Sequence, residues 1–191
     1  MNQNIKSWLA VEEDNLPSLK TLSFISFTFF LCGALLFPLD DGGTWTYIRE
    51  YVGLIWHLSM FFFINKLGTP EWGKKAGTYW VLIDVLSGIL YLNNFYSILG
   101  DASLGIASSG PFQICYVIRL CAHIFEGIWL ISSAITTDNK VIKVCGICAG
   151  ILIAGYSLVS PFSPTWLLTL NMPFMIIWMF MILIGKYQKN K

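Results

Sequence analysis

Long apolar runs joined by short polar connections take up nearly all of this chain of 191 residues. An α-helix of about 20 apolar residues matches the thickness of the hydrocarbon core of a bilayer. Such a helix also satisfies its own backbone hydrogen bonds where no water is present. The predicted spans are the six apolar runs 22–39, 47–65, 79–99, 112–136, 141–159 and 165–185. The sequence therefore predicts an all-α integral membrane bundle of six transmembrane helices, arranged as three helical hairpins.

The composition excludes an ordinary soluble domain. Hydrophobic residues make up 55% of the chain and charged residues only 12%, and the mean hydropathy is +0.64, values that soluble domains do not share. We expect residues 1–21 to form a cytoplasmic segment, residues 22–185 the bundle and residues 186–191 a cytoplasmic tail. A short interfacial helix is one option for the first segment, because apolar side chains occur among its polar ones.

The second run is the weakest of the six. Its uninterrupted apolar part, residues 51–64, is short and contains His57. A crossing helix must therefore extend past Arg49 and Glu50 to reach the required length. The alternative is a re-entrant or strongly tilted segment.

The distribution of lysines predicts the orientation. All of them lie in the N-terminal segment, in alternate connections or in the C-terminal tail: Lys6, Lys20, Lys66, Lys74, Lys75, Lys140, Lys143, Lys186, Lys189 and Lys191. The other connections, 40–46, 100–111 and 160–164, contain neither lysine nor arginine. Since basic loops remain on the cytoplasmic side, we expect both termini in the cytoplasm and the protein in a bacterial inner membrane.

Five ionisable residues stand out inside the predicted spans. Arg119, His123 and Glu126 are four and three residues apart, so they share one face of the fourth span. His57 in the second span is predicted at the depth of His123, and Asp84 lies in the third span. A charge at the centre of a membrane helix costs about 2.5–3.5 kcal/mol on insertion scales, so a functional site is the default interpretation. We therefore predict that Arg119, His123, Glu126, His57 and Asp84 bind a ligand or a proton.

The predicted orientation gives these groups a direction. Arg119 is expected in the outer half of its span, whereas Glu126 and Asp84 are expected toward the cytoplasmic side. Glu50, at the outer end of the second span, lies on the helical face of His57. If the second, third and fourth spans adjoin, these groups line one polar cavity.

Two functions compete for such a cavity. The leading hypothesis is movement or sensing of a small solute or proton, because histidine exchanges protons near neutral pH. The rival is a structural or accessory subunit, whose buried charges pair across helices or dock a partner in the membrane. The expected partners are the lipid bilayer, a small solute or proton, and a second copy or another membrane protein. No phosphate loop, nucleophile elbow or basic nucleic-acid patch occurs in the sequence, so we expect no nucleic acid and do not favour an enzyme.

Two cofactor hypotheses use the same residues. His57 and His123, at matched depth on different helices, suit bis-histidine ligation of haem b. Alternatively, His57, His123 and Glu126 supply the two imidazoles and one carboxylate of a catalytic zinc ion, as in an intramembrane metal-dependent hydrolase. No sequence motif supports either group, so the prediction is that the protein holds no cofactor.

Each returning span carries an isoleucine-tryptophan step: Ile55-Trp56, Ile128-Trp129 and Ile177-Trp178. Descent from a repeated helical hairpin would explain this pattern. The layout resembles uncharacterised bacterial families of small six-span membrane proteins, whose return helices read as apolar residues, Trp, apolar residues and then Gly-Lys or Gly-Arg. The stretch from Trp178 to Gly185-Lys186 has this form. The resemblance implies a six-span fold and brings no activity with it.

Three smaller features complete the predictions. Pro173 is expected to break the sixth span and expose backbone carbonyls, or simply to kink it. Cys145 and Cys148 have the spacing of a redox pair, but packing of small buried thiols between helices is favoured on the cytoplasmic side. Gly146-x-x-x-Gly150 predicts a close contact between helices, either within the chain or between subunits.

Overall fold

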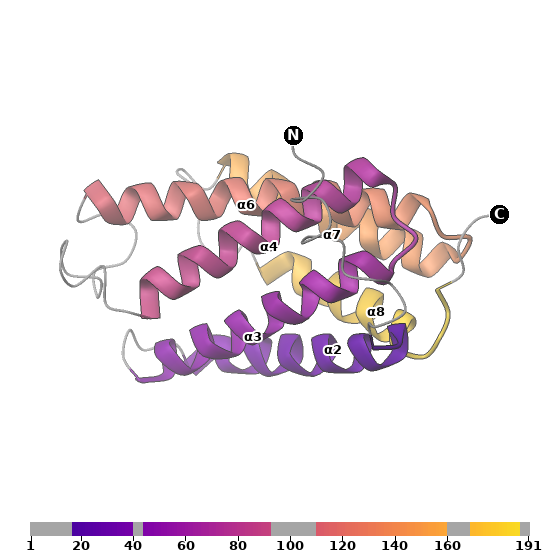
Figure 1. Cartoon of the computed structure of the whole chain (residues 1–191), viewed down its shortest axis with the longest axis horizontal. Helices are drawn as coiled ribbons and strands as arrows, with labels where there is room; N and C mark the ends of the chain where they lie inside the picture. The colour runs from indigo at the N-terminus through magenta and orange to yellow at the C-terminus, as the bar shows by residue number, and fades with distance from the viewer. Residues whose placement is uncertain (1–16, 40–43, 93–109, 160–168, 188–191) are drawn as a thin grey trace, which may run out of the picture.

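The computed structural model describes residues 17–39, 44–92, 110–159 and 169–187, and within these ranges the chain is all-α (Figure 1). The elements are α2 (Leu19–Leu36), the 3₁₀-helix η2 (Phe37–Leu39), α3 (Thr44–Lys66), α4 (Glu71–Leu92), α6 (Gly110–Ile135), α7 (Lys140–Val159) and α8 (Met172–Leu183). The all-α prediction is thus confirmed for the described ranges. Most of the predicted terminal segments, 1–21 and 186–191, lies outside them.

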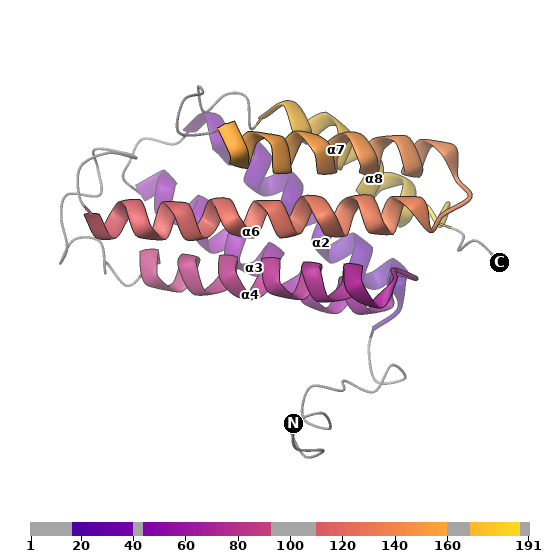
Figure 2. The same cartoon turned by 90° about the horizontal axis from the view of Figure 1, so that it is seen from above.

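The six described α-helices form a closed ring. Each helix packs against the next one along the chain, and α8 packs against α2. Successive helices run in opposite directions, as the two views in Figures 1 and 2 show. The described lysines therefore gather at one end of the ring, which we call the lysine end: Lys20, Lys66, Lys74, Lys75, Lys140, Lys143 and Lys186.

Among the described residues, three helical stretches are long and apolar enough to cross a membrane, judged by length and composition: Leu19–Leu39, Ile118–Ile135 and Lys140–Val159. They indicate that the protein associates with a membrane. α3 and α4, with 23 and 22 residues, have the length but contain more polar and charged residues. α8 has 12 residues and is therefore about 18 Å long, less than a bilayer core of about 30 Å. Crossing by all six helices remains a prediction.

Two helices begin at places other than the apolar runs indicate. α4 begins at Glu71 rather than at Tyr79, because hydropathy detects the apolar run but not the polar first turns of a helix. α8 begins at Met172, and Pro173 lies in its first turn, where a proline removes no intrahelical hydrogen bond. A 3₁₀ turn at residues 169–171 leads directly into α8, so the backbone changes its helical form beside Pro173. Residues 165–168 of the predicted sixth span lie outside the described residues, so a break within a longer span stays a prediction.

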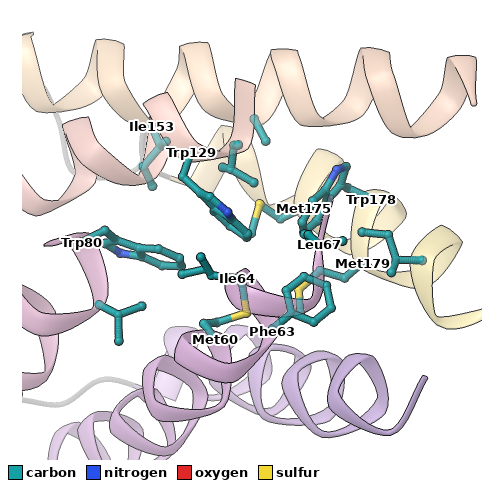
Figure 3. Close-up of a cluster of buried hydrophobic side chains, with 14 of the residues drawn as sticks. Met60, Phe63, Ile64, Leu67, Trp80, Trp129, Ile153, Met175, Trp178 and Met179 are labelled. Carbon is teal, nitrogen blue, oxygen red and sulfur yellow. The ribbon is translucent and has the colours of Figure 1, made fainter. Parts of the chain in front are cut away.

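A column of aromatic side chains lies in the interior of the ring, among buried aliphatic residues (Figure 3). Trp80 stacks on Trp129 with ring centroids 5.4 Å apart, and Trp129 meets Trp178 edge-on at 5.6 Å. Trp56 meets Trp80 edge-on, also at 5.6 Å, and Phe63 contacts both Trp129 and Trp178. We call Trp56, Trp80, Trp129 and Trp178 the tryptophan column.

The isoleucine-tryptophan steps have a structural meaning in this ring. Three of the four tryptophans in the column belong to the steps, and they come from α3, α6 and α8. The isoleucine of each step is exposed instead: Ile55, Ile128 and Ile177. Adjacent residues of a helix point about 100° apart, so each step directs an indole inward and an aliphatic side chain outward.

Glycines allow a close approach of α6 and α7. A Cβ atom on Gly127 would lie 2.5 Å from the carbonyl oxygen of Gly150, and a Cβ atom on Gly150 would lie 2.7 Å from that of Gly127. Gly146 faces Ala134 of α6 and Trp178 of α8 in the same way. The contact that the Gly146-x-x-x-Gly150 motif predicts is therefore formed within the chain.

Candidate functional site

Arg119 joins three helices inside the ring. Its Nε lies 3.2 Å from Asp84 Oδ1 on α4, and its Nη2 lies 3.0 Å from Glu50 Oε2 on α3. The Asp84 side chain is 0% exposed and that of Glu50 is 8% exposed, whereas the Arg119 side chain is 32% exposed. Hydrogen bonds between charged partners are the strong ones. The predicted second, third and fourth spans therefore adjoin, and this ion-pair network holds them together.

His57 extends the network on α3. Its Nε2 lies 3.3 Å from Asp84 Oδ2, and its Nδ1 lies 2.7 Å from the carbonyl oxygen of Gly53. The Asp84 contact has the distance of an ion pair but not the alignment of a hydrogen bond. Both ring nitrogens of His57 thus face oxygen acceptors.

Asp84 lies at the centre of the network and not at its cytoplasmic side, where the sequence placed it. Because α4 already begins at Glu71, Asp84 is near the middle of that helix. At this level it reaches both Arg119 and His57. Ser87 is buried one turn further along α4.

Glu50 belongs to the network, although it was not among the five predicted binding residues. α3 is one continuous helix through this position, as a crossing helix requires. Glu50 also accepts a hydrogen bond from Arg49 Nη2 at 3.2 Å, and the Arg49 guanidinium lies over the Phe37 ring. The sequence signal was the spacing, because Glu50 lies about two turns before His57 on the same helical face.

His123 and Glu126 lie next to the network without taking part in its ion pairs. They follow Arg119 along α6 by about one and two turns toward the lysine end. Glu126 is 3% exposed and has no ion pair or hydrogen bond with another described residue. The Nδ1 atom of His123 is buried and, within the described ranges, has no hydrogen-bond partner. The structure therefore brings all five predicted residues to one region, but pairs only three of them.

The charges of this region do not cancel. Among the described residues, this region contains two guanidinium groups, Arg49 and Arg119, and three carboxyl groups, Glu50, Asp84 and Glu126. The guanidinium groups pair with Glu50 and Asp84, so one negative charge is left over when both histidines are neutral. A net charge is costly in a low-dielectric interior. One proton on His57, His123 or Glu126 would make the whole group neutral.

The tryptophan column begins at this network. The His57 ring lies 4.6 Å from Trp56 and 5.6 Å from Trp80 between centroids. The indole N–H groups of all four tryptophans are buried and have no acceptor among the described residues. Each such donor left without a partner costs about 1–3 kcal/mol, and a buried indole N–H usually has one. Four together would cost an amount comparable with the usual net stability of a domain, about 5–15 kcal/mol.

The cofactor hypotheses concern His57, His123 and Glu126. Within the described ranges, no group of three or more His, Cys, Asp or Glu is placed to hold a metal ion. The Nε2 atom of His57, which would ligate a haem iron, faces Asp84. The haem and zinc hypotheses stay predictions. Cys145 and Cys148 are both free, and Cys145 is buried, as packing between helices predicts.

Two surface hollows lie at the lysine end, one between the start of α2 and the end of α8 and one at the start of α4. Neither is lined by a residue of the ion-pair network. Comparisons with protein-family models, with curated proteins and with solved structures found no match to this chain. The functional inference therefore depends on the geometry of the network and the column.

Proposed function

We propose that this chain is a multipass protein of a bacterial inner membrane that binds and exchanges a proton inside its ring while it moves or senses a small solute. In this proposal all six helices cross the bilayer, and the lysine end and both termini are cytoplasmic. Support comes from the alternating helix directions and from the gathering of lysines at one end.

The observation that carries the proposal is the uncompensated carboxyl group among the buried charges. One proton makes the region neutral, and it can occupy His57, His123 or Glu126 with the same net charge. Movement of that proton among the three groups therefore avoids the cost of a net charge in the membrane. A purely structural ion-pair network requires only paired charges, so it does not explain a buried Glu126 that has no partner among the described residues.

The partial exposure of Arg119 suggests how a solute would couple to the proton. An anionic solute would compete with Glu50 for the Arg119 guanidinium, which is 32% exposed. A proton on Glu50 would favour that exchange, because it removes the negative charge that Arg119 otherwise binds. Glu126 lies on the other side of His123, toward the lysine end, where the proton would be released.

Proton flux into proteoliposomes tests the proposal. The vesicles contain a trapped pH-sensitive dye, and the outside solution is made more acidic in one step. The interior of vesicles with the wild-type protein should then acidify faster than that of vesicles without protein. Glu126→Gln keeps the shape of the side chain but cannot exchange a proton, so we expect flux to fall to the protein-free level while thermal stability is kept. The matched control is Glu71→Gln, an exposed carboxyl at the lysine end, which should behave as wild type. Wild-type flux equal to that of empty vesicles would contradict the proposal.

A second function is favoured by one specific observation, the bonding of Arg119 to carboxylates on two other helices. The same contacts would serve an accessory subunit, because pairing of buried charges orders neighbouring helices. In that case the Glu126→Gln and His123→Ala variants change stability, and neither wild type nor variants conduct protons. The flux experiment with a parallel unfolding measurement thus separates the two functions.

A further inference from the structure

The tryptophan column continues the polar groups of α6 toward the lysine end. Trp129 follows Glu126 by about one turn of α6, and Trp80 stacks on it from α4. The indole nitrogen of Trp178 lies beside Gly146 of α7, which faces Ala134 of α6. The indole N–H groups therefore occur at successive levels along the ring interior (Figure 3).

A hydroxyl pair lies at the far end of this series. Thr136 Oγ1 and Tyr187 Oη lie 3.1 Å apart at the lysine end. Between them and Glu126, Ser132 and Ser133 are buried on α6. Each donates its own proton to a helix carbonyl, but each hydroxyl oxygen can still accept a hydrogen bond. Indole N–H groups and hydroxyl oxygens thus both occur on the helices between Glu126 and the lysine end.

The indole N–H groups are spread out and do not surround one point. Trp80, Trp129 and Trp178 are each 0% exposed, they come from three different helices, and their donors have no acceptor among the described residues. Spaced single donors suit small molecules that both accept and donate hydrogen bonds, which is the property of water. A single anion would instead require several donors directed at one place.

We infer that the indole N–H groups of Trp80, Trp129 and Trp178 bind a file of water molecules that connects Glu126 to the lysine end. In this arrangement each indole donates to a water molecule, and that water donates to a serine hydroxyl or to the next water. The file provides the cytoplasmic half of the proton path, so the inference rests on the proposed function. The ion-pair network provides the opposite half.

Magnetic resonance of the indole N–H groups tests the water file directly. Protein with ¹⁵N-labelled tryptophan in lipid nanodiscs gives one indole signal per tryptophan, and Trp80→Phe, Trp129→Phe and Trp178→Phe assign the three signals. We expect all three to show magnetisation transfer from water, although the side chains are fully buried. Trp72, which is 54% exposed, is the positive control. Three indole signals without transfer from water would overturn the inference.

Proton flux provides the functional measurement. Trp129→Phe removes the donor and keeps an aromatic ring, so we expect proton flux to fall about tenfold, the effect of losing one hydrogen-bond partner. Trp72→Phe should leave the flux unchanged. If the wild-type protein conducts protons but its three indole signals show no magnetisation transfer from water, the water file is overturned and the proposed function is kept. If the indole signals show transfer from water but the wild-type protein conducts no protons, the proton path itself is overturned. Failure of the water file and failure of the proposed function therefore give different results. If Trp129→Phe does not fold, the indole signals of the wild-type protein and of Trp80→Phe decide whether the water file exists.

Discussion

At the scale of single residues, Asp84 determines the geometry of the network. In the part of the chain that the structure describes, it is the one carboxylate that contacts both Arg119 and His57, and its side chain is fully buried. Loss of one partner from a buried ion pair leaves the other charge without compensation, which is more costly than loss of the whole pair. The stability of the ring should therefore depend strongly on this side chain.

Asp84→Ala is expected to lower the free energy of unfolding by about 3 kcal/mol, at the lower end of the usual effect because Arg119 stays partly exposed. Tryptophan fluorescence during denaturation in detergent measures this change. Asp138→Ala, at an exposed position in the connection between α6 and α7, is the control and should change stability by less than about 0.5 kcal/mol. Equal stability of the two variants would show that the network contributes nothing to folding.

At the scale of helices, the glycines of α6 and α7 determine how closely these elements pack. Gly127 and Gly150 face each other through their backbones, and a backbone atom cannot rotate away from an added methyl group. Gly155 lies on the same helix as Gly150, but a Cβ atom there would meet nothing within 4 Å. The same substitution should therefore have opposite effects at the two positions.

Gly127→Ala is expected to destabilise the protein by about 1–3 kcal/mol, because it forces two packed helices apart. Gly155→Ala is expected to stabilise it by about 0.5–1 kcal/mol, because alanine loses less conformational freedom in a helix than glycine does. Thermal unfolding of both variants measures the difference. A tolerated Gly127→Ala would mean that α6 and α7 are further apart than in this structure.

At the scale of the whole molecule, the proposed orientation in the membrane is based on the closed ring and the lysine end. Neighbouring helices run in opposite directions, so the start of α3 and the connection between α6 and α7 lie at opposite ends (Figure 2). The positive-inside rule assigns the lysine end to the cytoplasm. Labelling of single cysteines can verify this assignment.

In a variant without native cysteines, Thr44→Cys should react with a membrane-impermeant maleimide in intact cells. Asn139→Cys, next to Lys140 at the lysine end, should react only after the cells are opened. Ser18→Cys and Lys186→Cys should behave as Asn139→Cys, because six crossings place both termini on one side. Labelling of Ser18→Cys and Lys186→Cys on different sides would exclude an even number of crossings.

The sequence predicted the residue types of the site but not all of its contacts. Arg119, His123, Glu126, His57 and Asp84 were found because ionisable groups in apolar runs are costly and therefore conspicuous. The partners of Arg119 are 35 and 69 residues away along the chain, so no local spacing identifies them. Asp84 was assigned to the wrong level because the polar first turns of α4 do not appear in a hydropathy profile.

The sequence by itself determined the helical class, the approximate positions of the helices and the concentration of lysines at one end. These properties depend on composition and on local backbone hydrogen bonds, which are the same whichever helices become neighbours. Only the tertiary structure decided the closed ring, the pairing of Glu50 with Arg119 and the convergence of the repeated tryptophans. Ion pairs and ring contacts require a particular order and vertical register of helices, and the packing of glycines and indoles between them sets that register.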